Sequence, residues 1–251
     1  MSEKLREIIS QSRCIVFFGG AGVSTESGIP DFRSEQGLYN AKHNYGAEPE
    51  EILSHRFFVD HPNMFYRYFK ENLVFPDVRP NSAHISLAKM ECMGKLKGIV
   101  TQNIDGLHQM AGSNLVYELH GSIRRYYCTE CRELYSFEYI IDSANCRDPE
   151  GLEVFVPYCS RCGGIVRPDV VLYEESLDTD VMNSAIESVR CADTLIVGGT
   201  SLVVYPAAGL LRYFRGEHLI LINKSPTTYD GKADLVIRES IGKVLAETVA
   251  V

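Results

Sequence analysis

Hydrophobic residues along this chain follow two alternating patterns, one typical of helices and one typical of buried strands. Leu5, Ile8 and Ile9 recur at helical spacing, which predicts a helix over 2–12. The continuous apolar run Cys14–Phe18 follows and ends in a glycine-rich turn, as a buried parallel strand does. Five similar runs predict further strands at Gly98–Thr101, Leu115–Tyr117, Thr194–Val197, His218–Ile222 and Leu235–Ile237.

Helical patterns separate several of these strands. They cover Asn81–Met93, Val181–Val189 and Pro206–Phe214. Strands that alternate with helices are typical of βαβ units, so the sequence predicts an α/β fold with a Rossmann-like, doubly wound parallel sheet of about six strands. Such sheets bind ligands at the carboxyl ends of their strands, which makes the loops after the strands the first place to look for chemistry.

Two stretches interrupt this alternation. Residues 34–78 are rich in aromatic side chains and predict a helical insertion with a mobile loop. Residues 124–168 hold paired cysteines and short strand-like pieces such as Val154–Val156. The sequence therefore predicts a sheet domain of 1–33, 79–123 and 169–251, a loop and helical insertion at 34–78, and a small cysteine-bearing domain at 124–168.

Length and composition restrict the class of protein. The chain has 251 residues, 45% hydrophobic and 23% charged, which is typical of a globular domain with an elaborate insert. Its 25 basic and 33 acidic residues give a net charge of −8, which disfavours nucleic acid as a partner because binding it requires neutralised phosphates. The sequence shows neither a membrane span nor an export signal, so we expect a cytoplasmic protein without a membrane partner. The oligomeric state has no signature in the sequence.

The loop after the first predicted strand is rich in glycine, with Gly19, Gly20, Gly22 and Gly28 close together. Glycines let a backbone approach a pyrophosphate, and amides at the start of a helix hold its charge. However, Thr25 stands where the usual dinucleotide fingerprint has a further glycine, and no acidic residue after a second strand completes that fingerprint. Two interpretations stay open here: a nucleotide-binding loop, or a turn whose glycines serve only to adopt a positive φ.

Two C-x-x-C units give the strongest signal from spacing alone. Cys128 and Cys131 form the first, and Cys159 and Cys162 form the second. Two such pairs predict a Cys₄ zinc site, because each pair supplies two thiolates to one tetrahedral ion. Four thiolates leave no open coordination position, so the zinc is expected to hold structure, and a zinc hydrolase is excluded.

Polar residues follow the second and third predicted strands. Gln102, Asn103 and Asp105 come after the second strand, and His120 followed by Gly121 comes after the third. Both groups fall where a parallel sheet displays its catalytic residues. An imidazole at this edge is suited to act as a general base because it titrates near neutral pH. From position alone, His120 is either such a base or a histidine bonded for structural reasons.

Taken together, these motifs resemble one family closely. Residues 20–33 and 101–105, His120-Gly121, the two cysteine pairs and Gly199–Leu202 occur in the order typical of sirtuins, which are NAD-dependent protein-lysine deacylases. The resemblance covers nearly the whole chain. It implies a Rossmann-like domain and a small zinc-bearing domain, with NAD and an acyl-lysine peptide meeting in the cleft between them.

The resemblance also implies roles for individual residues. His120 is expected to be the catalytic base, and Asn103 is expected to orient ribose or water. The implied NAD contacts, several of them through backbone atoms, are Gly20, Ala21, Gly22, Thr25, Phe32, Arg33, Gln102, Ile104, Asp105, His120, Thr200, Ser201, Asn223 and Ile241.

The implied reaction consumes NAD as a co-substrate. Nicotinamide leaves C1′ of the ribose while positive charge develops there, and the acyl oxygen attacks from a fixed position. His120 then takes a proton from a ribose hydroxyl, and water completes the release of lysine, nicotinamide and O-acetyl-ADP-ribose. The expected partners are therefore proteins or peptides that carry acetyl-lysine.

Five positions concern the choice of substrate. Sirtuins that prefer acidic acyl groups carry a Tyr-x-x-Arg pair, whereas here Tyr66 is followed three residues later by Phe69. Thr25 and Asp31 also follow the deacetylase pattern, so we expect a preference for acetyl or longer neutral acyl groups. Glu174 stands where the family usually has glycine, in a strand expected to pair with the substrate backbone. Together with the net acidity, it favours basic residues around the target lysine.

Three other functions remain as alternatives. A zinc ribbon on a nucleotide-sensing sheet would bind partners without turnover, and the combination of His120 with Asn103 argues against it. A mono-ADP-ribosyltransferase would break the same glycosidic bond. A dehydrogenase would instead retain nicotinamide as a hydride carrier.

Overall fold

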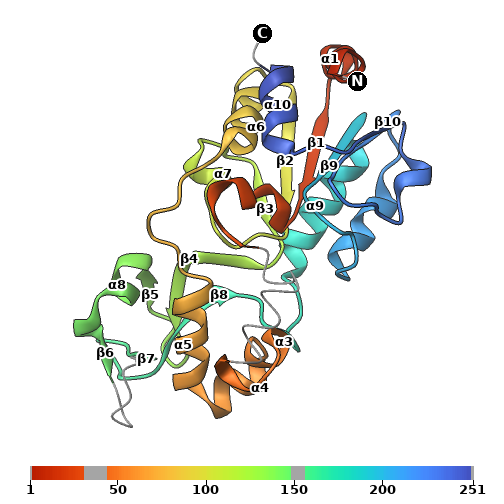
Figure 1. Cartoon of the computed structure of the whole chain (residues 1–251). Coiled ribbons are helices and arrows are strands. Elements are labelled where there is room, and N and C mark those ends of the chain that lie inside the picture. Colours follow the sequence, from red (N-terminus) through yellow and green to blue (C-terminus); the bar gives the residue numbers. More distant parts are fainter. Residues whose placement is uncertain (1, 31–43, 148–155, 250–251) are drawn as a thin grey trace. The chain divides into compact units, whose positions relative to one another are not determined.

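The computed structural model describes residues 2–30, 44–147 and 156–249, and the chain divides into two compact units. The first, called here the sheet unit, consists of Met1–Pro30, Val78–Leu119 and Leu177–Val251. The second, called the cysteine unit, consists of Asp31–Asp77 and His120–Ser176. Figure 1 labels most of the α-helices and strands of both units.

A parallel sheet of six strands forms the centre of the sheet unit (Figure 1). Its order is β11-β10-β9-β1-β2-β3. The chain therefore first forms β1, β2 and β3 toward one side of the sheet, and then adds β9, β10 and β11 on the other side of β1. This doubly wound order confirms the predicted α/β, Rossmann-like fold. The strands are β1 (Ile15–Gly19), β2 (Leu96–Thr101), β3 (Val116–Glu118), β9 (Thr194–Gly198), β10 (His218–Ile222) and β11 (Leu235–Ile237).

Both faces of this sheet are covered, which explains why its strands are apolar at successive positions. Ile15 and Phe17 of β1 join one hydrophobic cluster, whereas Val16 and Phe18 join the other. Helices α1, α6 and α10 complete the first cluster, and α9 and η4 complete the second. The helices of the sheet unit are α1 (Ser2–Gln11), η1 (Ala21–Val23), η2 (Thr25–Ser27), α6 (Ser82–Cys92), α7 (Leu107–Met110), α9 (Thr179–Cys191), η4 (Ala207–Tyr213), η5 (Asp230–Lys232) and α10 (Ile241–Val249).

The predicted helices are present, but one is of a different type. The segment expected to be helical over 206–214 is the 3₁₀ helix η4. The N–H of Gly209 donates to the carbonyl of Pro206 at 2.9 Å, which closes a three-residue turn. Over such a short segment, the apolar spacing of a 3₁₀ helix and an α-helix is too similar for a sequence pattern to separate them.

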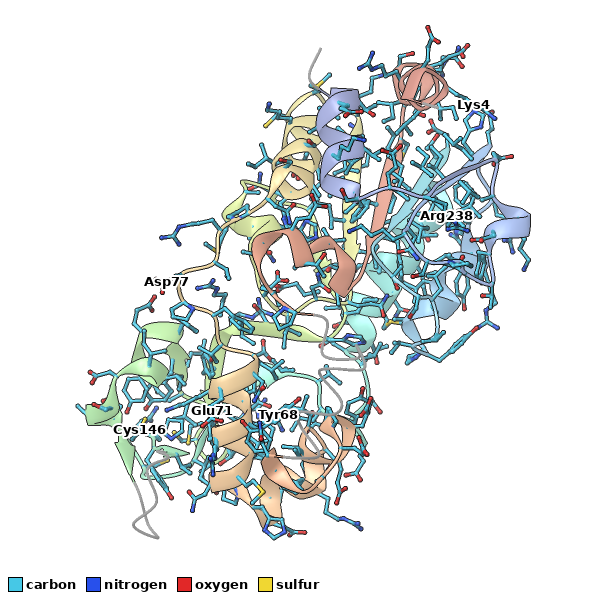
Figure 2. All side chains as sticks on the ribbon, viewed as in Figure 1. Lys4, Tyr68, Glu71, Asp77, Cys146 and Arg238 are labelled. Carbon is cyan, nitrogen blue, oxygen red and sulfur yellow. The ribbon has the colours of Figure 1, made fainter. Side chains whose placement is uncertain are left out.

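The cysteine unit combines short helices with two small antiparallel sheets. In the larger sheet, β4 pairs with β5 on one side and with β8 on the other. Helix α5, which carries the labelled Tyr68 and Glu71 in Figure 2, contacts this sheet through the Tyr66 hydroxyl, which donates to the Val166 carbonyl. The elements are α3 (Pro49–Ile52), α4 (His55–Asp60), α5 (Pro62–Asn72), β4 (Gly121–Cys128), β5 (Leu134–Ser136), α8 (Phe137–Ile141), η3 (Ser143–Asn145), β6 (Cys146–Arg147), β7 (Val156–Pro157) and β8 (Val166–Val170).

Pairing within the cysteine unit gives it wider bounds than the 124–168 expected from the sequence. Strand β8 pairs with β4 along its length, and Tyr173 exchanges backbone hydrogen bonds with Leu53 and His55. The unit therefore takes in the helical segment and residues beyond 168. The division into three domains stays a prediction, and most of the expected strand Val154–Val156 lies outside the described residues. None of the helices in the described part of the chain has the length and apolarity that a bilayer span requires.

Candidate active site

The glycine-rich loop leaves the carboxyl end of β1 and touches the loop that follows β9. The N–H of Gly22 donates to the carbonyl of Gly199 at 2.8 Å. A Cβ on Gly20 would lie 2.9 Å from Cβ of Thr200, and one on Gly22 would lie 2.8 Å from Cα of Gly199. Gly20 has φ −139°, and neither glycine is in the left-handed region. The interpretation of the glycines as residues that need positive φ is therefore wrong for Gly20 and Gly22, which close packing of the two loops explains. It holds for Gly28, whose φ is 88°.

These two loops flank the point where the strand order of the sheet reverses. Strands β1 and β9 are neighbours there, and this is where doubly wound sheets bind their ligands. The next strand, β2, brings Gln102 to the same edge, where its backbone N–H donates to the Gly19 carbonyl at 3.0 Å. Its Nε2 donates to Oγ1 of Thr200 at 3.2 Å. Residues expected to contact NAD from β1, β2 and β9 thus lie together.

Asn103 belongs to a hydrogen-bonded network at this edge. Its Nδ2 donates to the Gly20 carbonyl and to Oγ of Ser24, both at 3.1 Å. Oγ of Ser24 in turn donates to Oδ2 of Asp105 at 2.7 Å, and Oδ1 of Asp105 accepts the N–H of Leu107 at 2.9 Å. Ser24 and Asp105 are buried, so water competes little with these bonds. Asn103 is therefore held in one orientation.

Ser24 is the residue of this network that the sequence analysis did not select. Its hydroxyl links Asn103 to Asp105, two residues that were selected. The available signal was its place inside the glycine-rich motif, between Ala21 and Thr25.

The other expected NAD residues of the sheet edge have more accessible side chains. Ala21 and Ile104 are half-buried, whereas Thr25 and Ser201 are exposed. The Thr25 hydroxyl donates to the carbonyl of Gly22 at 3.1 Å, which holds it against its own loop.

The remaining expected NAD residues differ in their surroundings. Asn223 follows β10, and its side-chain amide donates to the Ser225 carbonyl at 2.8 Å. Ile241 begins α10 and is only 3% exposed within the hydrophobic core, so its side chain is not accessible to a ligand. Phe32 and Arg33 lie outside the described residues, as does Asp31, which the sequence analysis used for acyl preference.

His120 comes two residues after β3 and immediately before β4. It is half-buried, and its carbonyl accepts the N–H of Val171 at 3.0 Å. Its backbone is thus fixed by the strand-like segment that continues β8. The role of His120 as a base stays a prediction.

The four cysteines of the C-x-x-C pairs form one cluster in the cysteine unit. All four Sγ atoms lie within 4.8 Å of one another. The Sγ atoms of Cys128 and Cys162 are 3.4 Å apart, and those of Cys131 and Cys159 are 3.6 Å apart. A tetrahedral zinc ion with Zn–S bonds of about 2.3 Å places its sulfurs about 3.8 Å apart. The donor set therefore fits one zinc ion in closed coordination.

Two equivalent turns build this cluster. The N–H of Arg132 donates to the Cys128 carbonyl at 3.1 Å, and the N–H of Gly163 donates to the Cys159 carbonyl at 3.0 Å. Arg132 and Gly163 both have a left-handed backbone conformation, with φ 61° and 79°. The second turn has the glycine that this backbone favours. In the first turn, the guanidinium of Arg132 stacks 4.1 Å from the ring centroid of Tyr127.

Hydrogen bonds favour the thiolate form of Cys159. Its burial raises the pKa of the thiol, but the Tyr135 hydroxyl and the N–H groups of Cys162 and Arg161 donate to its Sγ and lower that pKa overall. The thiolate is the form that binds zinc. Cys146, labelled in Figure 2, is not part of the cluster; its Sγ accepts a hydrogen bond from Nζ of Lys70 at 3.5 Å.

Glu174, the expected departure from the family pattern, lies in a left-handed backbone conformation with φ 76°. Glycine is favoured there, which explains its usual presence at this position. The carboxylate of Glu174 accepts the N–H of Arg56 at 3.1 Å, in the first turn of α4. The next residue, Glu175, accepts two hydrogen bonds from the guanidinium of Arg167, at 2.7 and 3.0 Å. Both glutamates therefore fix the segment that follows β8.

Two histidines of the sheet unit are buried side by side. The rings of His84 and His108 have their centroids 4.8 Å apart. Burial lowers the pKa of His84 to about 4, although Glu26 opposes the shift, and burial with the neighbouring His84 lowers the pKa of His108 to about 3. Both rings are therefore neutral at neutral pH. In this state Nδ1 of His84 accepts the N–H of Asn81 at 3.3 Å.

The chain is expected to lose stability between pH 7 and pH 5 because of these histidines. Their pKa values are lowered in the folded state, so in this range the unfolded chain binds protons that the folded chain does not. The loss begins below an ordinary histidine pKa of about 6.5 and amounts to about 2 kcal/mol per histidine by pH 5. Urea unfolding at both pH values measures it.

A pair of variants tests the source of this pH dependence. His108→Leu is expected to remove about half of the loss, relative to its own stability at pH 7. His61→Gln, a change at an exposed histidine, is expected to leave the loss unchanged. An unaltered pH dependence in His108→Leu would show that other groups cause it.

Comparison with known proteins relates this arrangement to one family. The family model of the Sir2 family matches residues 20–206. The NAD-dependent protein deacetylase of Clostridium acetobutylicum is 60% identical over 246 residues, which are 98% of this chain and 96% of that protein. The enzyme of the same name from Clostridium perfringens is 60% identical over 247 residues, 98% of this chain and 97% of that protein.

Solved structures agree with the sequence relatives. A Sir2 structure with a p53 peptide and NAD⁺ has a TM-score of 0.86 at 36% identity, covering 100% of this chain and 98% of that one. A complex of a Sir2 homolog with NAD has a TM-score of 0.86 at 38% identity, covering 100% and 93%. The family motifs, the doubly wound sheet and the four-cysteine cluster occur together in this chain, which belongs to the Sir2 family.

Proposed function

We propose that this chain is an NAD-dependent protein-lysine deacetylase, which transfers the acetyl group of acetyl-lysine to ADP-ribose. The products are nicotinamide, O-acetyl-ADP-ribose and free lysine. One observation carries the proposal: over 98% of its length the chain is 60% identical to proteins named NAD-dependent protein deacetylase. Solved relatives include Sir2 bound to an acetylated peptide, and Sir2 with 2′-O-acetyl-ADP-ribose and a deacetylated p53 peptide.

Residues of the sheet edge are proposed to bind NAD. The loops at Gly20 and Thr200 pack closely at the reversal point of the sheet, which supports a pyrophosphate site there. Gln102 and Asp105 hold the nicotinamide and its ribose. NAD supplies the electrophilic C1′ carbon once nicotinamide departs. Asn103, fixed by Gly20 and Ser24, orients the ribose or the attacking water.

His120 is proposed to be the general base. It accepts a proton from a ribose hydroxyl after the acyl oxygen has become bonded to C1′, and the freed oxygen then attacks the acyl carbon. The protein therefore contributes mainly position, because the acyl oxygen is a weak nucleophile that needs a fixed attack geometry.

The four clustered cysteines are proposed to hold one structural zinc ion. Their sulfurs fill all four positions of a tetrahedral ion, so the metal supplies stability to the cysteine unit. The partners of the enzyme are acetylated proteins or peptides, and we expect it to act in the cytoplasm.

One assay separates this function from the alternatives. The protein is incubated with NAD and an acetyl-lysine peptide, and every product is identified by mass. A deacetylase releases nicotinamide only when the peptide is present, and the peptide loses its acetyl group. A peptide that gains ADP-ribose would indicate a transferase, NADH formation would indicate a dehydrogenase, and unchanged NAD would indicate a binding module.

Neutral acyl groups are expected to be the preferred substrates. In the cysteine unit, Tyr66 and Phe69 are fully buried on α5, and Phe69 stacks on Phe65 with centroids 5.6 Å apart. The position that carries arginine in the acidic-acyl branch of the family is thus part of an apolar cluster. We expect turnover of acetyl-lysine peptide to exceed that of succinyl-lysine peptide by at least about tenfold, because an unpaired carboxylate is costly to desolvate.

Steady-state kinetics with two peptides that differ only in the acyl group measures this preference. A propionyl-lysine peptide is the control, because its acyl group is larger than acetyl but carries no charge. Comparable kcat/KM for succinyl and acetyl peptides would contradict the expectation.

A further inference from the structure

Two consecutive 3₁₀ turns, η1 and η2, form the loop proposed to bind NAD. Within the loop the bonds are short-range: the N–H of Ser24 donates to the Ala21 carbonyl, and the N–H of Gly28 donates to the Thr25 carbonyl. Turns of this type have poorer hydrogen-bond geometry than an α-helix, so the loop depends on outside contacts for its shape. Two side chains outside the expected NAD set supply such contacts.

Asn81 makes the first contact, from the start of α6. Its Nδ2 donates to the carbonyl of Val23 at 2.8 Å and to Oγ of Ser27 at 3.0 Å. Val23 belongs to the first turn of the loop and Ser27 to the second. A single amide group thus links the two turns to each other and to a helix of the core.

The side-chain oxygen of Asn81 makes a separate contact, with the helix itself. Oδ1 of Asn81 accepts the N–H of Ala83 at 2.8 Å and caps α6, and the His84 ring completes the capping box. The oxygen therefore serves the helix and the nitrogen serves the loop. Because different atoms carry the two tasks, a substitution can remove one and leave the other.

Glu26 makes the second contact, from within the loop. Its Oε1 accepts the N–H of Gly242 at 3.0 Å, in the first turn of α10. A carboxylate is favoured there because the amino end of a helix carries partial positive charge. A Cβ on Gly242 would lie 2.5 Å from Oε2 of Glu26, so the glycine permits this close approach.

We propose that Asn81 and Glu26 are positioning residues for NAD, which fix the glycine-rich loop from the side of α6 and α10. The inference rests on the proposed NAD-binding role of that loop. A loop that is already held in its binding conformation loses less conformational entropy when NAD binds. Both residues therefore raise NAD affinity without touching the reacting atoms. Asn81 links the loop to α6 and Glu26 links it to α10. Ser24, in contrast, links the same loop to Asn103 and Asp105.

Serine and alanine at position 81 separate the loop contact from the helix cap. Asn81→Ser keeps a capping oxygen for α6 but loses the amide that reaches Val23 and Ser27. Asn81→Ala loses both. We expect both variants to bind NAD about tenfold more weakly, the net effect of one or two hydrogen bonds. Asn81→Ala, which also loses the helix cap, is expected to lower the melting temperature more than Asn81→Ser does.

Glu26 offers a matched conservative control. Glu26→Gln keeps an oxygen that accepts the Gly242 N–H, so its NAD affinity is expected to stay within about threefold of the parent, whereas Glu26→Ala is expected to lose about tenfold. Calorimetric titration with NAD alone measures these affinities. In steady-state assays the KM for NAD rises, while kcat and the KM for acetyl-peptide stay within about twofold.

The outcomes divide clearly. Unchanged NAD affinity in Asn81→Ser and Glu26→Ala would overturn the inference, and a fall in kcat at unchanged NAD affinity would overturn it too. A parent protein that binds no NAD would instead overturn the proposed function, which the first titration of the series reveals.

Discussion

Replacing His120 by alanine is expected to stop deacetylation almost completely, with a loss of at least about a hundredfold in kcat. A positioned general base contributes this much or more to a reaction that depends on proton transfer. The loss is expected to fall on the step that follows nicotinamide departure. Exchange of labelled nicotinamide into NAD, which needs only the first step, is therefore expected to be reduced less than product formation.

The control for this variant is His61→Ala, which removes an exposed histidine of the cysteine unit and is expected to leave turnover unchanged. Zinc content and melting temperature of the His120 variant should equal those of the parent. Deacetylation within about tenfold of the parent rate would show that His120 is not the base.

Replacing Cys128 by serine is expected to release zinc and unfold the cysteine unit. Cys128 is fully buried in the cluster, and its sulfur lies 3.4 Å from that of Cys162. Structural zinc contributes about 10–16 kcal/mol of apparent binding free energy in zinc-finger peptides at neutral pH, which is far more than the margin that keeps a small domain folded. Metal analysis and circular dichroism report the two losses separately.

Cys191→Ser is the matched control, because Cys191 is an exposed cysteine outside the cluster. It is expected to keep one zinc ion and the parent spectrum. A Cys128 variant that retains stoichiometric zinc and an unchanged spectrum would contradict the assignment of the four cysteines as ligands.

The sheet was predictable because burial on both faces leaves a direct trace in the sequence. The run that forms β1 is apolar at successive positions, since Phe17 and Phe18 pack into opposite cores. The division of the chain into two units was harder to predict from the sequence. It depends on the pairing of β8 with β4 and on contacts such as that of Tyr66 with Val166, and no local pattern encodes these.

Part of the candidate site was predictable for a related reason. Gln102, Asn103 and Asp105 follow a strand, and the carboxyl ends of neighbouring parallel strands meet at one edge. Ser24 and Asn81 were not found, because their roles arise from hydrogen bonds across long stretches of chain, such as that from Asn81 to Val23.

The cysteine cluster was predictable from spacing, since two C-x-x-C units in one chain are typical of a Cys₄ zinc site. The spacing does not show which other residues stabilise the two turns. The hydroxyl of Tyr135 reaches Cys159 from a separate strand, and Arg132 adopts a left-handed conformation that favours glycine. Both features became visible only with the folded chain.

The stoichiometry of the reaction is the most direct test of acetyl transfer to ADP-ribose. Nicotinamide, deacetylated peptide and O-acetyl-ADP-ribose are quantified together over a time course with limiting acetyl-peptide. Acetyl transfer to ADP-ribose predicts that all three form in equal amounts and that nicotinamide release stops when the peptide is exhausted. Free acetate without consumption of NAD, or nicotinamide release that continues without peptide, would contradict it.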